Sequence, residues 1–107
     1  AYHLSYFRRM WPTERSLHTC NVRKSHGFHL VAQGADPLPA VLDVDRAYRM
    51  RLTWQGSAVE FTIDDIPCLS WIDDGSVGGP ARRGGAIGLR QMAPLIAEYS
   101  NLLVEAL

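Results

Sequence analysis

Hydrophobic and polar residues alternate along most of this chain, which is the pattern of β-strands that bury one of their two faces. The alternation is most regular in AYRMRLTWQG (47–56), where large apolar residues occupy the even positions and polar residues the odd ones. A turn signal at Gly56 leads into VEFTID (59–64), where apolar residues again fall on alternate positions. We therefore predict that these two stretches form a β-hairpin with both apolar rows facing the core.

A second hairpin is predicted nearer the start of the chain. The sequence LHTCNVRKSHGFHLVAQ (17–33) contains two alternating stretches separated by a turn-like Ser-His-Gly. In the first stretch, Cys20 and Val22 alternate with polar residues, which is typical of a half-buried strand. The residues of the second stretch that we expect on the inner face are Phe28, Leu30 and Ala32.

Three other short stretches have a composition that favours strands: Tyr2–Arg9, Ile66–Asp73 and Ala86–Met92. The segments between the strands are expected to be loops. GADPLP (34–39) contains two prolines, and DDGSVGGPARRGG (73–85) is rich in glycine.

The last residues, APLIAEYSNLLVEAL (93–107), allow two interpretations. Their apolar residues fall near the 3.6-residue period of a helix, and Pro94 stands where a helix could begin. From Glu98 onward they also alternate, with apolar residues on both faces, which suits a strand inside a sandwich. Because the rest of the chain is patterned as strands, we predict a closing strand. The roughly eight strand candidates favour an all-β antiparallel β-sandwich over an α/β fold.

Composition and charge narrow the possibilities further. The 107 residues are 47% hydrophobic and 21% charged, as expected of a single globular domain over residues 1–107. Eleven basic and eleven acidic residues cancel, and no apolar run is long enough to span a bilayer, so we expect neither nucleic acid nor a membrane as a partner. Cys20 and Cys68 are expected to be buried thiols. A strand-like run follows Ala1 directly, so we expect a fragment, and the compartment stays open with the cytoplasm slightly favoured.

Three strings resemble the YesU-like family of concanavalin-A-like (jelly-roll) proteins: YFRRMWPTERSLHTCNVRKSHGFHLVAQGADPLP, FTIDDIPCLSWIDDG and GGAIGLRQMAPLIAEYSNLLV. The resemblance implies a jelly-roll sandwich and an association with the utilisation of plant polysaccharides, such as pectin or rhamnogalacturonan. Domains of this family run to roughly 200 residues, so the resemblance also implies that this chain is the C-terminal part of one, without its N-terminal portion. One departure is Asp65, where the family pattern has glycine, which puts the type of that turn in question.

A carbohydrate site needs planar polar groups that bind sugar hydroxyls, and alternation places several such side chains on the outward faces of the predicted strands. The candidate binding residues are Tyr6, Arg8, Asn21, Arg23, His29, Gln33, Arg90 and Met92. Arg8, Arg23 and Arg90 would suit an acidic sugar such as a uronate, because a guanidinium binds a carboxylate through two parallel hydrogen bonds. The alternative is that these arginines form an ordinary solvated face.

An enzyme on the same scaffold is the second hypothesis. The E-x-D-x-x-E string that carries the catalytic carboxylates of jelly-roll glucanases is absent from the sequence. The residue types that a polysaccharide lyase uses are present in His18, His29, Tyr6 and Arg23, but their spacing does not require a lyase.

Metal and cofactor sites are not expected. His26 and His29 would lie on opposite faces of a strand, and Asp73-Asp74-Gly75 has the composition of an ordinary turn. The sequence thus favours a carbohydrate-binding jelly roll whose partner is an oligosaccharide or polysaccharide. A polysaccharide lyase or glycoside hydrolase and a purely structural sandwich domain remain as alternatives.

Overall fold

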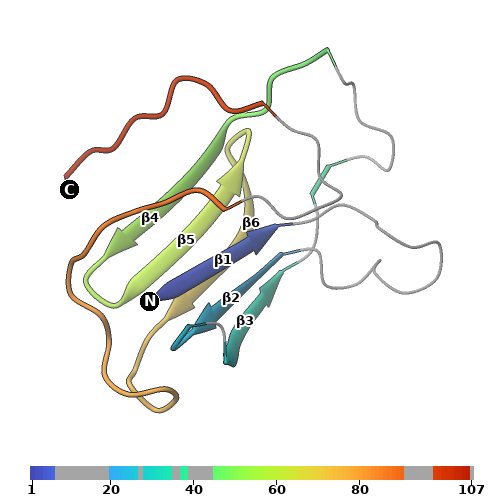
Figure 1. Cartoon of the computed structure of the whole chain (residues 1–107). Coiled ribbons are helices and arrows are strands. Elements are labelled where there is room, and N and C mark those ends of the chain that lie inside the picture. The colour runs from blue at the N-terminus through green and yellow to red at the C-terminus, as the bar shows by residue number, and fades with distance from the viewer. Residues whose placement is uncertain (7–19, 27, 35–36, 39–44, 91–97, 107) are drawn as a thin grey trace.

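The structure is a computed structural model that describes residues 1–6, 20–26, 28–34, 37–38, 45–90 and 98–106. Within these ranges, six strands form two antiparallel sheets (Figure 1). The strands of the first sheet, in spatial order, are β1 (Tyr2–Tyr6), β2 (Cys20–Lys24) and β3 (His29–Gly34). Those of the second are β4 (Met50–Gln55), β5 (Ala58–Ile63) and β6 (Ile66–Ile72). The predicted all-β antiparallel sandwich is confirmed.

The core lies between the two sheets and consists of the inner rows of their strands. Val59, Phe61 and Ile63 of β5 are at most 3% exposed, as their alternation predicts. Cys20 and Val22 of β2 face them from the other sheet and are at most 1% exposed. Both predicted hairpins are present, since β2 pairs with β3 and β4 pairs with β5. The two cysteines are thiols, as predicted, with Cys20 buried and its counterpart in β6 half-buried.

Close contact between β3 and β6 closes one side of the sandwich. At Gly34, the last residue of β3, a Cβ atom would lie 2.1 Å from the carbonyl oxygen of Cys68 and 3.2 Å from the Cβ of Leu69. Backbones that approach this closely leave room only for glycine. Gly34, expected to begin a loop, therefore ends a strand.

The side of the sandwich that β4 borders is more open. Met50 and Leu52 share the inner face of their hairpin, as predicted, but they are 50% and 54% exposed. The residues directly opposite them on β5 are Ile63 and Phe61, which are 0% and 2% exposed. The first sheet thus covers the inner face of β5 but leaves the inner face of β4 largely exposed.

The inner face predicted for β3 is wrong in part, because β3 pairs with β2 through a β-bulge. The register pairs Val22 with Ala32, then skips one residue and pairs Arg23 with Leu30. Leu30 therefore lies on the outer side with Arg23 and is 43% exposed, and Phe28 is 82% exposed. Of the three residues expected on the inner face, only Ala32 packs against the core. The prediction assumed strict alternation, and the extra residue of a bulge reverses it.

The turn between β5 and β6 answers the question raised by Asp65. Asp64 and Asp65 have φ values of 49° and 63°, and the strands pair immediately on either side of them. Two consecutive positive φ values in a two-residue hairpin loop define a type I′ turn, whose second position favours glycine. The turn keeps this geometry although a side chain occupies that position.

The C-terminal part of the chain departs from the prediction. Residues 73–85, the glycine-rich loop, are irregular as expected, but residues 86–90 and 98–106 also contain neither helix nor strand. The strand predicted over Ala86–Met92 is therefore wrong for residues 86–90, and the closing strand from Glu98 is wrong as well. A strand requires a hydrogen-bonded neighbour, which alternation alone does not supply. The parts of the predicted strands that lie outside the described residues are 7–9, 17–19 and 91–92.

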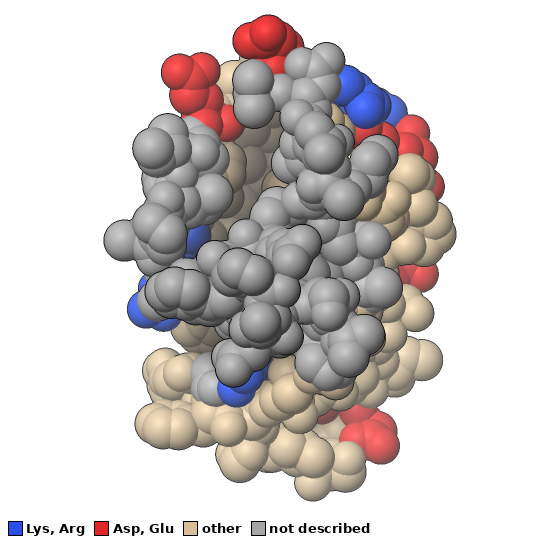
Figure 2. All heavy atoms as spheres, turned by 90° about the vertical axis from the view of Figure 1, so that its right-hand side faces the viewer, with Lys and Arg blue, Asp and Glu red and all other residues tan. Residues whose placement is uncertain are grey.

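Basic and acidic side chains occur together on the face shown in Figure 2, and at its upper right they touch one another. Exposed ion pairs join Arg46 to Asp64 and Arg49 to Asp65. In the part of the chain that the structure describes, no helix is both long and apolar enough for a membrane span.

Candidate functional site

Two inner rows of the sandwich end in residues of opposite charge. Lys24 follows Val22 in β2 at the two-residue spacing of an inner row, and Asp73 follows Trp71 of β6 in the same way. Both side chains enter the space between the sheets, where they are 0% and 1% exposed. Lys24 Nζ lies 2.8 Å from Asp73 Oδ1 and 2.7 Å from Oδ2. Such buried charges are tolerated as a pair, because either one alone would carry a large desolvation penalty.

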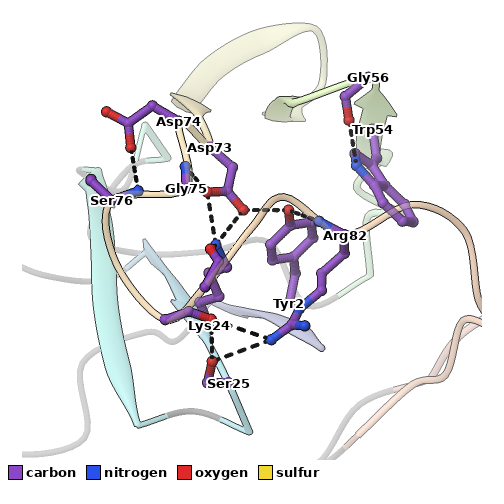
Figure 3. Close-up of polar contacts among 12 residues, drawn as sticks. Tyr2, Lys24, Ser25, Trp54, Gly56, Asp73, Asp74, Gly75, Ser76 and Arg82 are labelled. Atoms are coloured by element: carbon purple, nitrogen blue, oxygen red, sulfur yellow. Dashed lines mark hydrogen bonds and ion pairs between the residues drawn. The ribbon is translucent and has the colours of Figure 1, made fainter.

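Tyr2 extends this ion pair toward the surface. Its hydroxyl donates a hydrogen bond to Asp73 Oδ2 at 2.6 Å and accepts one from the backbone N–H of Arg82 at 2.8 Å (Figure 3). Its ring makes edge-to-face contacts with Trp54 and Trp71, at centroid distances of 5.5 and 5.6 Å. Tyr2 thus links the two sheets and the glycine-rich loop at one point.

The glycine-rich loop is held by the same group of residues. Lys24 Nζ donates a hydrogen bond to the carbonyl oxygen of Gly79. The Ser25 hydroxyl donates to the carbonyl oxygen of Gly78 at 3.0 Å, and the Arg82 guanidinium lies 3.3 Å from the same hydroxyl. Side chains of β2 and of the turn after it therefore fix a segment that has no regular structure of its own.

The protonation states of this cluster follow from its contacts. Burial raises the pKa of Asp73, but hydrogen bonds from Lys24, Tyr2 and the Gly75 N–H together outweigh burial and leave this pKa below its ordinary value. Burial, and then the hydrogen bond to Asp73, raise the pKa of Tyr2 above its ordinary value. At neutral pH Asp73 is thus a carboxylate and Tyr2 keeps its proton. The cluster is suited to bracing the loop rather than to proton transfer.

A hollow of about 640 Å³ lies beside the braced loop. One wall is formed by Trp54, near the end of β4, with Gly56 and Ser57 of the next turn. Arg82 and Arg83 of the glycine-rich loop form the opposite wall. The indole Nε1 of Trp54 donates a hydrogen bond to the carbonyl oxygen of Gly56 at 3.0 Å, which fixes the orientation of its ring.

The hollow combines an aromatic surface with the exposed guanidinium of Arg83, whereas the guanidinium of Arg82 lies against Ser25 and Gly78. Trp54 is 36% exposed, and Arg83 is exposed as well, so both can contact a molecule in the hollow. Tyr2 connects the two walls, because its ring touches Trp54 and its hydroxyl binds the Arg82 N–H. A flat apolar ring beside fixed planar donors can bind a ligand that has one apolar face and polar or anionic edges.

Three of the sequence-predicted site residues share one surface on the outer side of the first sheet. Asn21 lies directly opposite Gln33 in the register, and Arg23 is the next outward residue of β2. Asn21 is only 5% exposed, and its Oδ1 has no hydrogen-bond partner among the residues that the structure describes. We call Asn21, Arg23 and Gln33 the outer polar face.

The other predicted site residues do not join this surface. Tyr6 lies on the inner side, with its ring 6.1 Å from that of Phe61. His29 pairs with Lys24 at the loop end of the sheet because of the bulge, and Arg90 is exposed in an irregular segment. The predicted residues that lie outside the described part of the chain are Arg8 and Met92.

The sequence did not indicate the residues that line the hollow or those that hold the glycine-rich loop, for different reasons. Lys24 and Asp73 each stand two residues after an apolar residue of an inner row, and their charges are opposite. The sequence pattern therefore does contain a signal for this pair. Trp54 was expected in the core because it belongs to such a row. The contact of Arg82 with Tyr2 joins residues far apart in sequence, and nothing in the spacing predicts it. Within the described ranges, no group of three or more His, Cys, Asp or Glu residues could hold a metal ion.

Comparisons with known proteins place this architecture in a family. The family model described as "Domain of unknown function (DUF1961)" matches residues 1–104. The "Uncharacterized protein YesU" of Bacillus subtilis (strain 168) is 54% identical over 104 residues, covering 97% of this chain and 47% of that protein. A solved Bacillus subtilis protein "of Unknown Function with Galectin-like Fold" is 56% identical, with a TM-score of 0.62 over 74% of this chain and 36% of that one. The chain thus spans about half the length of the curated relative, and it belongs to the DUF1961 family.

Proposed function

We propose that this chain binds carbohydrate, and that the hollow between Trp54 and the two arginines holds the sugar. The observation that carries the proposal is the meeting of one exposed indole with Arg82 and Arg83 across a hollow of about 640 Å³. Sugars have an apolar C–H face and polar edges, so an aromatic ring beside planar donors is complementary to them. The galectin-like fold of the solved relative supports the same class of ligand.

The charge of the hollow favours an acidic sugar. Among the described residues, Arg82 and Arg83 line it without any acidic side chain, and Arg83 supplies the exposed guanidinium, because that of Arg82 lies against Ser25 and Gly78. A uronate carboxylate can accept paired hydrogen bonds from one guanidinium, and such contacts are stronger than those to a neutral hydroxyl. A smaller hollow of about 190 Å³ beside the end of β6 is lined by Asp73 and Asp74, with no basic residue in the part of its lining that the structure describes. We therefore assign acidic oligosaccharides of the pectin or rhamnogalacturonan type to the hollow with the arginines.

Binding without turnover is the form of the proposal that the hollow supports best. A hydrolase or lyase would place a carboxylate pair or a free base against the sugar. Asp73, which Tyr2 links to the Arg82 backbone at the hollow, is instead buried against Lys24. If the chain were an enzyme on this scaffold, incubation with pectin fragments would produce new reducing ends or unsaturated uronates.

The outer polar face is a second candidate surface for the same ligand. Arg23 and Gln33 offer a guanidinium and an amide on one side of a sheet, and Asn21 lies buried between them. We rank this surface below the hollow because none of these side chains is aromatic.

Calorimetric titration with a short oligogalacturonate tests the proposal and separates the two surfaces. We expect Arg83→Ala to weaken binding by roughly tenfold or more, because hydrogen bonds to charged groups contribute about 1.5–3 kcal/mol. Arg83 is exposed, so its replacement leaves the fold intact. Two matched controls, Arg90→Ala and Arg51→Ala, remove an exposed arginine elsewhere and should bind as the wild type does.

The titration has distinct contradictory outcomes. Loss of binding in Arg23→Ala but not in Arg83→Ala would move the site to the outer polar face. Equal affinity for a neutral oligosaccharide of the same length would contradict the proposed preference for acidic sugars. An absence of binding to any saccharide would favour a structural sandwich domain.

A further inference from the structure

The side chain of Tyr2 contacts both walls of the hollow. Its ring meets the Trp54 indole edge to face, at a centroid distance of 5.5 Å. Its hydroxyl accepts a hydrogen bond at 2.8 Å from the backbone N–H of Arg82, the residue directly before Arg83. Figure 3 shows this hydroxyl between Asp73 and the Arg82 backbone. A change at Tyr2 therefore reaches both sides of the hollow.

Tyr2 is itself held firmly in place. Its hydroxyl donates a hydrogen bond at 2.6 Å to Asp73, whose side chain is 1% exposed and paired with Lys24. Its ring also meets the Trp71 indole edge to face, at a centroid distance of 5.6 Å. A ring between two indoles, with its hydroxyl on a buried carboxylate, has little freedom to move. It can therefore fix the position of a segment that is less well packed.

The wall that carries Arg83 is such a segment. Among the described contacts, the backbone anchor nearest to Arg83 is the hydrogen bond from the Arg82 N–H to Tyr2. No described atom lies within 4 Å of the Cβ position at Gly84 or Gly85, so packing does not hold the loop on the far side of Arg83. Segments with few packing contacts open readily unless hydrogen bonds hold them. The position of Arg83 thus depends on the Arg82 backbone and, through it, on Tyr2.

We propose that Tyr2 is a positioning residue for the sugar, because its hydroxyl fixes the wall that carries Arg83 and its ring fixes the wall formed by Trp54. The inference rests on the proposed function and adds to it the residue that holds the two walls relative to each other. Tyr2 does not belong to the described lining of the hollow, so its effect on binding is indirect. Without its hydroxyl, the sugar itself would have to order the arginine wall, which costs affinity.

Hydrogen exchange in the free chain tests the positioning without any sugar. Tyr2→Phe removes the hydroxyl and keeps the ring. We expect it to speed exchange of the Arg82 N–H at least about threefold, the effect of one lost hydrogen bond, and to leave exchange of the Trp54 indole N–H unchanged. Tyr2→Leu also removes the ring, so exchange of the Trp54 indole N–H should speed up as well. Tyr99→Phe is the matched control, because it changes an exposed tyrosine of an irregular segment, and it should alter neither signal.

A double-variant cycle with a short oligogalacturonate tests the consequence for binding. By calorimetry, Tyr2→Phe alone should weaken binding at least about threefold, because the sugar then has to order the arginine wall. In an Arg83→Ala background the same substitution should weaken binding by less than about 1.5-fold, since the guanidinium that Tyr2 positions is absent. A purely structural role of Tyr2 would give the same factor in both backgrounds. Urea denaturation checks that each variant is folded under the conditions of the titration.

Three results would overturn the inference. One is unchanged exchange at Arg82 in Tyr2→Phe, or at the Trp54 indole in Tyr2→Leu, whether or not the chain binds sugar. Another is an unchanged affinity of Tyr2→Phe for the sugar. The third is equal weakening by Tyr2→Phe with and without Arg83. If the wild type binds no saccharide, the proposed function fails, whereas exchange in the free chain still decides whether Tyr2 holds both walls.

Discussion

Lys24 and Asp73 show how two single residues hold a long irregular segment in place. Each is buried opposite the other, and Lys24 also binds the carbonyl oxygen of Gly79 in the glycine-rich loop. We predict that Asp73→Asn lowers the free energy of unfolding by about 3–5 kcal/mol, because the Lys24 ammonium is left buried without a counter-ion. Urea denaturation measures this change. The double variant Lys24→Met with Asp73→Asn should recover part of the loss, and a single-variant effect below about 1 kcal/mol would contradict the role of the pair.

The lowered pKa of Asp73 extends this prediction to the dependence of stability on pH. The unfolded carboxyl has a pKa of about 3.9, and the folded one titrates below that value. The stabilisation by Asp73 is therefore complete above the unfolded pKa and is lost as pH falls through the folded pKa. The free energy of unfolding of the wild type should fall below about pH 4, and that of Asp73→Asn should fall less steeply over the same range. Parallel curves for the two proteins would contradict the assignment.

At the scale of elements, the closed side of the sandwich depends on a glycine in β3. A methyl group at Gly34 would lie 2.1 Å from the Cys68 carbonyl oxygen, so β3 and β6 would have to move apart. We expect Gly34→Ala to lower the free energy of unfolding by about 1–3 kcal/mol, the usual range for overpacking. Gly88→Ala is a matched control, because no atom lies within 4 Å of its Cβ position, and it should change stability by less than about 0.5 kcal/mol. Equal effects in urea denaturation would show that β3 and β6 are not in close contact.

The turn between β5 and β6 can be improved by one substitution. Asp65 has a φ of 63°, which glycine adopts without the steric penalty of a side chain. We predict that Asp65→Gly raises the free energy of unfolding by roughly 0.5–1 kcal/mol, although it also removes the exposed ion pair with Arg49. Asp65→Asn removes the charge but keeps a side chain, so thermal unfolding of both variants separates the two effects. A destabilised Asp65→Gly would mean that the ion pair outweighs the backbone strain.

The strands that could be predicted are those that the local sequence marks. Alternation located the two hairpins and placed the buried residues of β2 and β5 correctly, and composition located β1 and β6. Alternation failed at Leu30, because the extra residue of a bulge leaves no mark in the composition of the strand. It failed again over residues 86–90 and 98–106, where the pattern is present but no strand lies alongside in the described structure. Alternation reports which side of a strand is apolar, and not whether a neighbour exists.

The candidate site was less predictable than the fold. Asn21, Arg23 and Gln33 lie on the side of the sheet opposite Cys20 and Val22, as alternation predicted, but Asn21 is buried there. The hollow depends on contacts among Tyr2, Trp54 and Arg82, which come from opposite ends and the middle of the chain. Such contacts follow from how the sheets pack, and no local pattern encodes them.

At the scale of the whole molecule, the sandwich has one closed and one open side, and the candidate site lies on the open one. β3 and β6 meet at Gly34 on the closed side, whereas the edge strand β4 carries Trp54 toward the glycine-rich loop. The buried Lys24–Asp73 pair holds the glycine-rich loop, which carries the arginines that line the hollow with Trp54. The candidate hollow thus lies where the core gives way to solvent.

The most direct measurement is a nuclear magnetic resonance titration of the chain with a short oligogalacturonate, with a neutral oligosaccharide of equal length as control. If the hollow binds acidic sugar, backbone shifts should concentrate at Trp54, Ser57 and residues 82–84, and the neutral sugar should cause much smaller ones. Shifts confined to Asn21, Arg23 and Gln33, or no saturable shifts with either sugar, would contradict carbohydrate binding in the hollow.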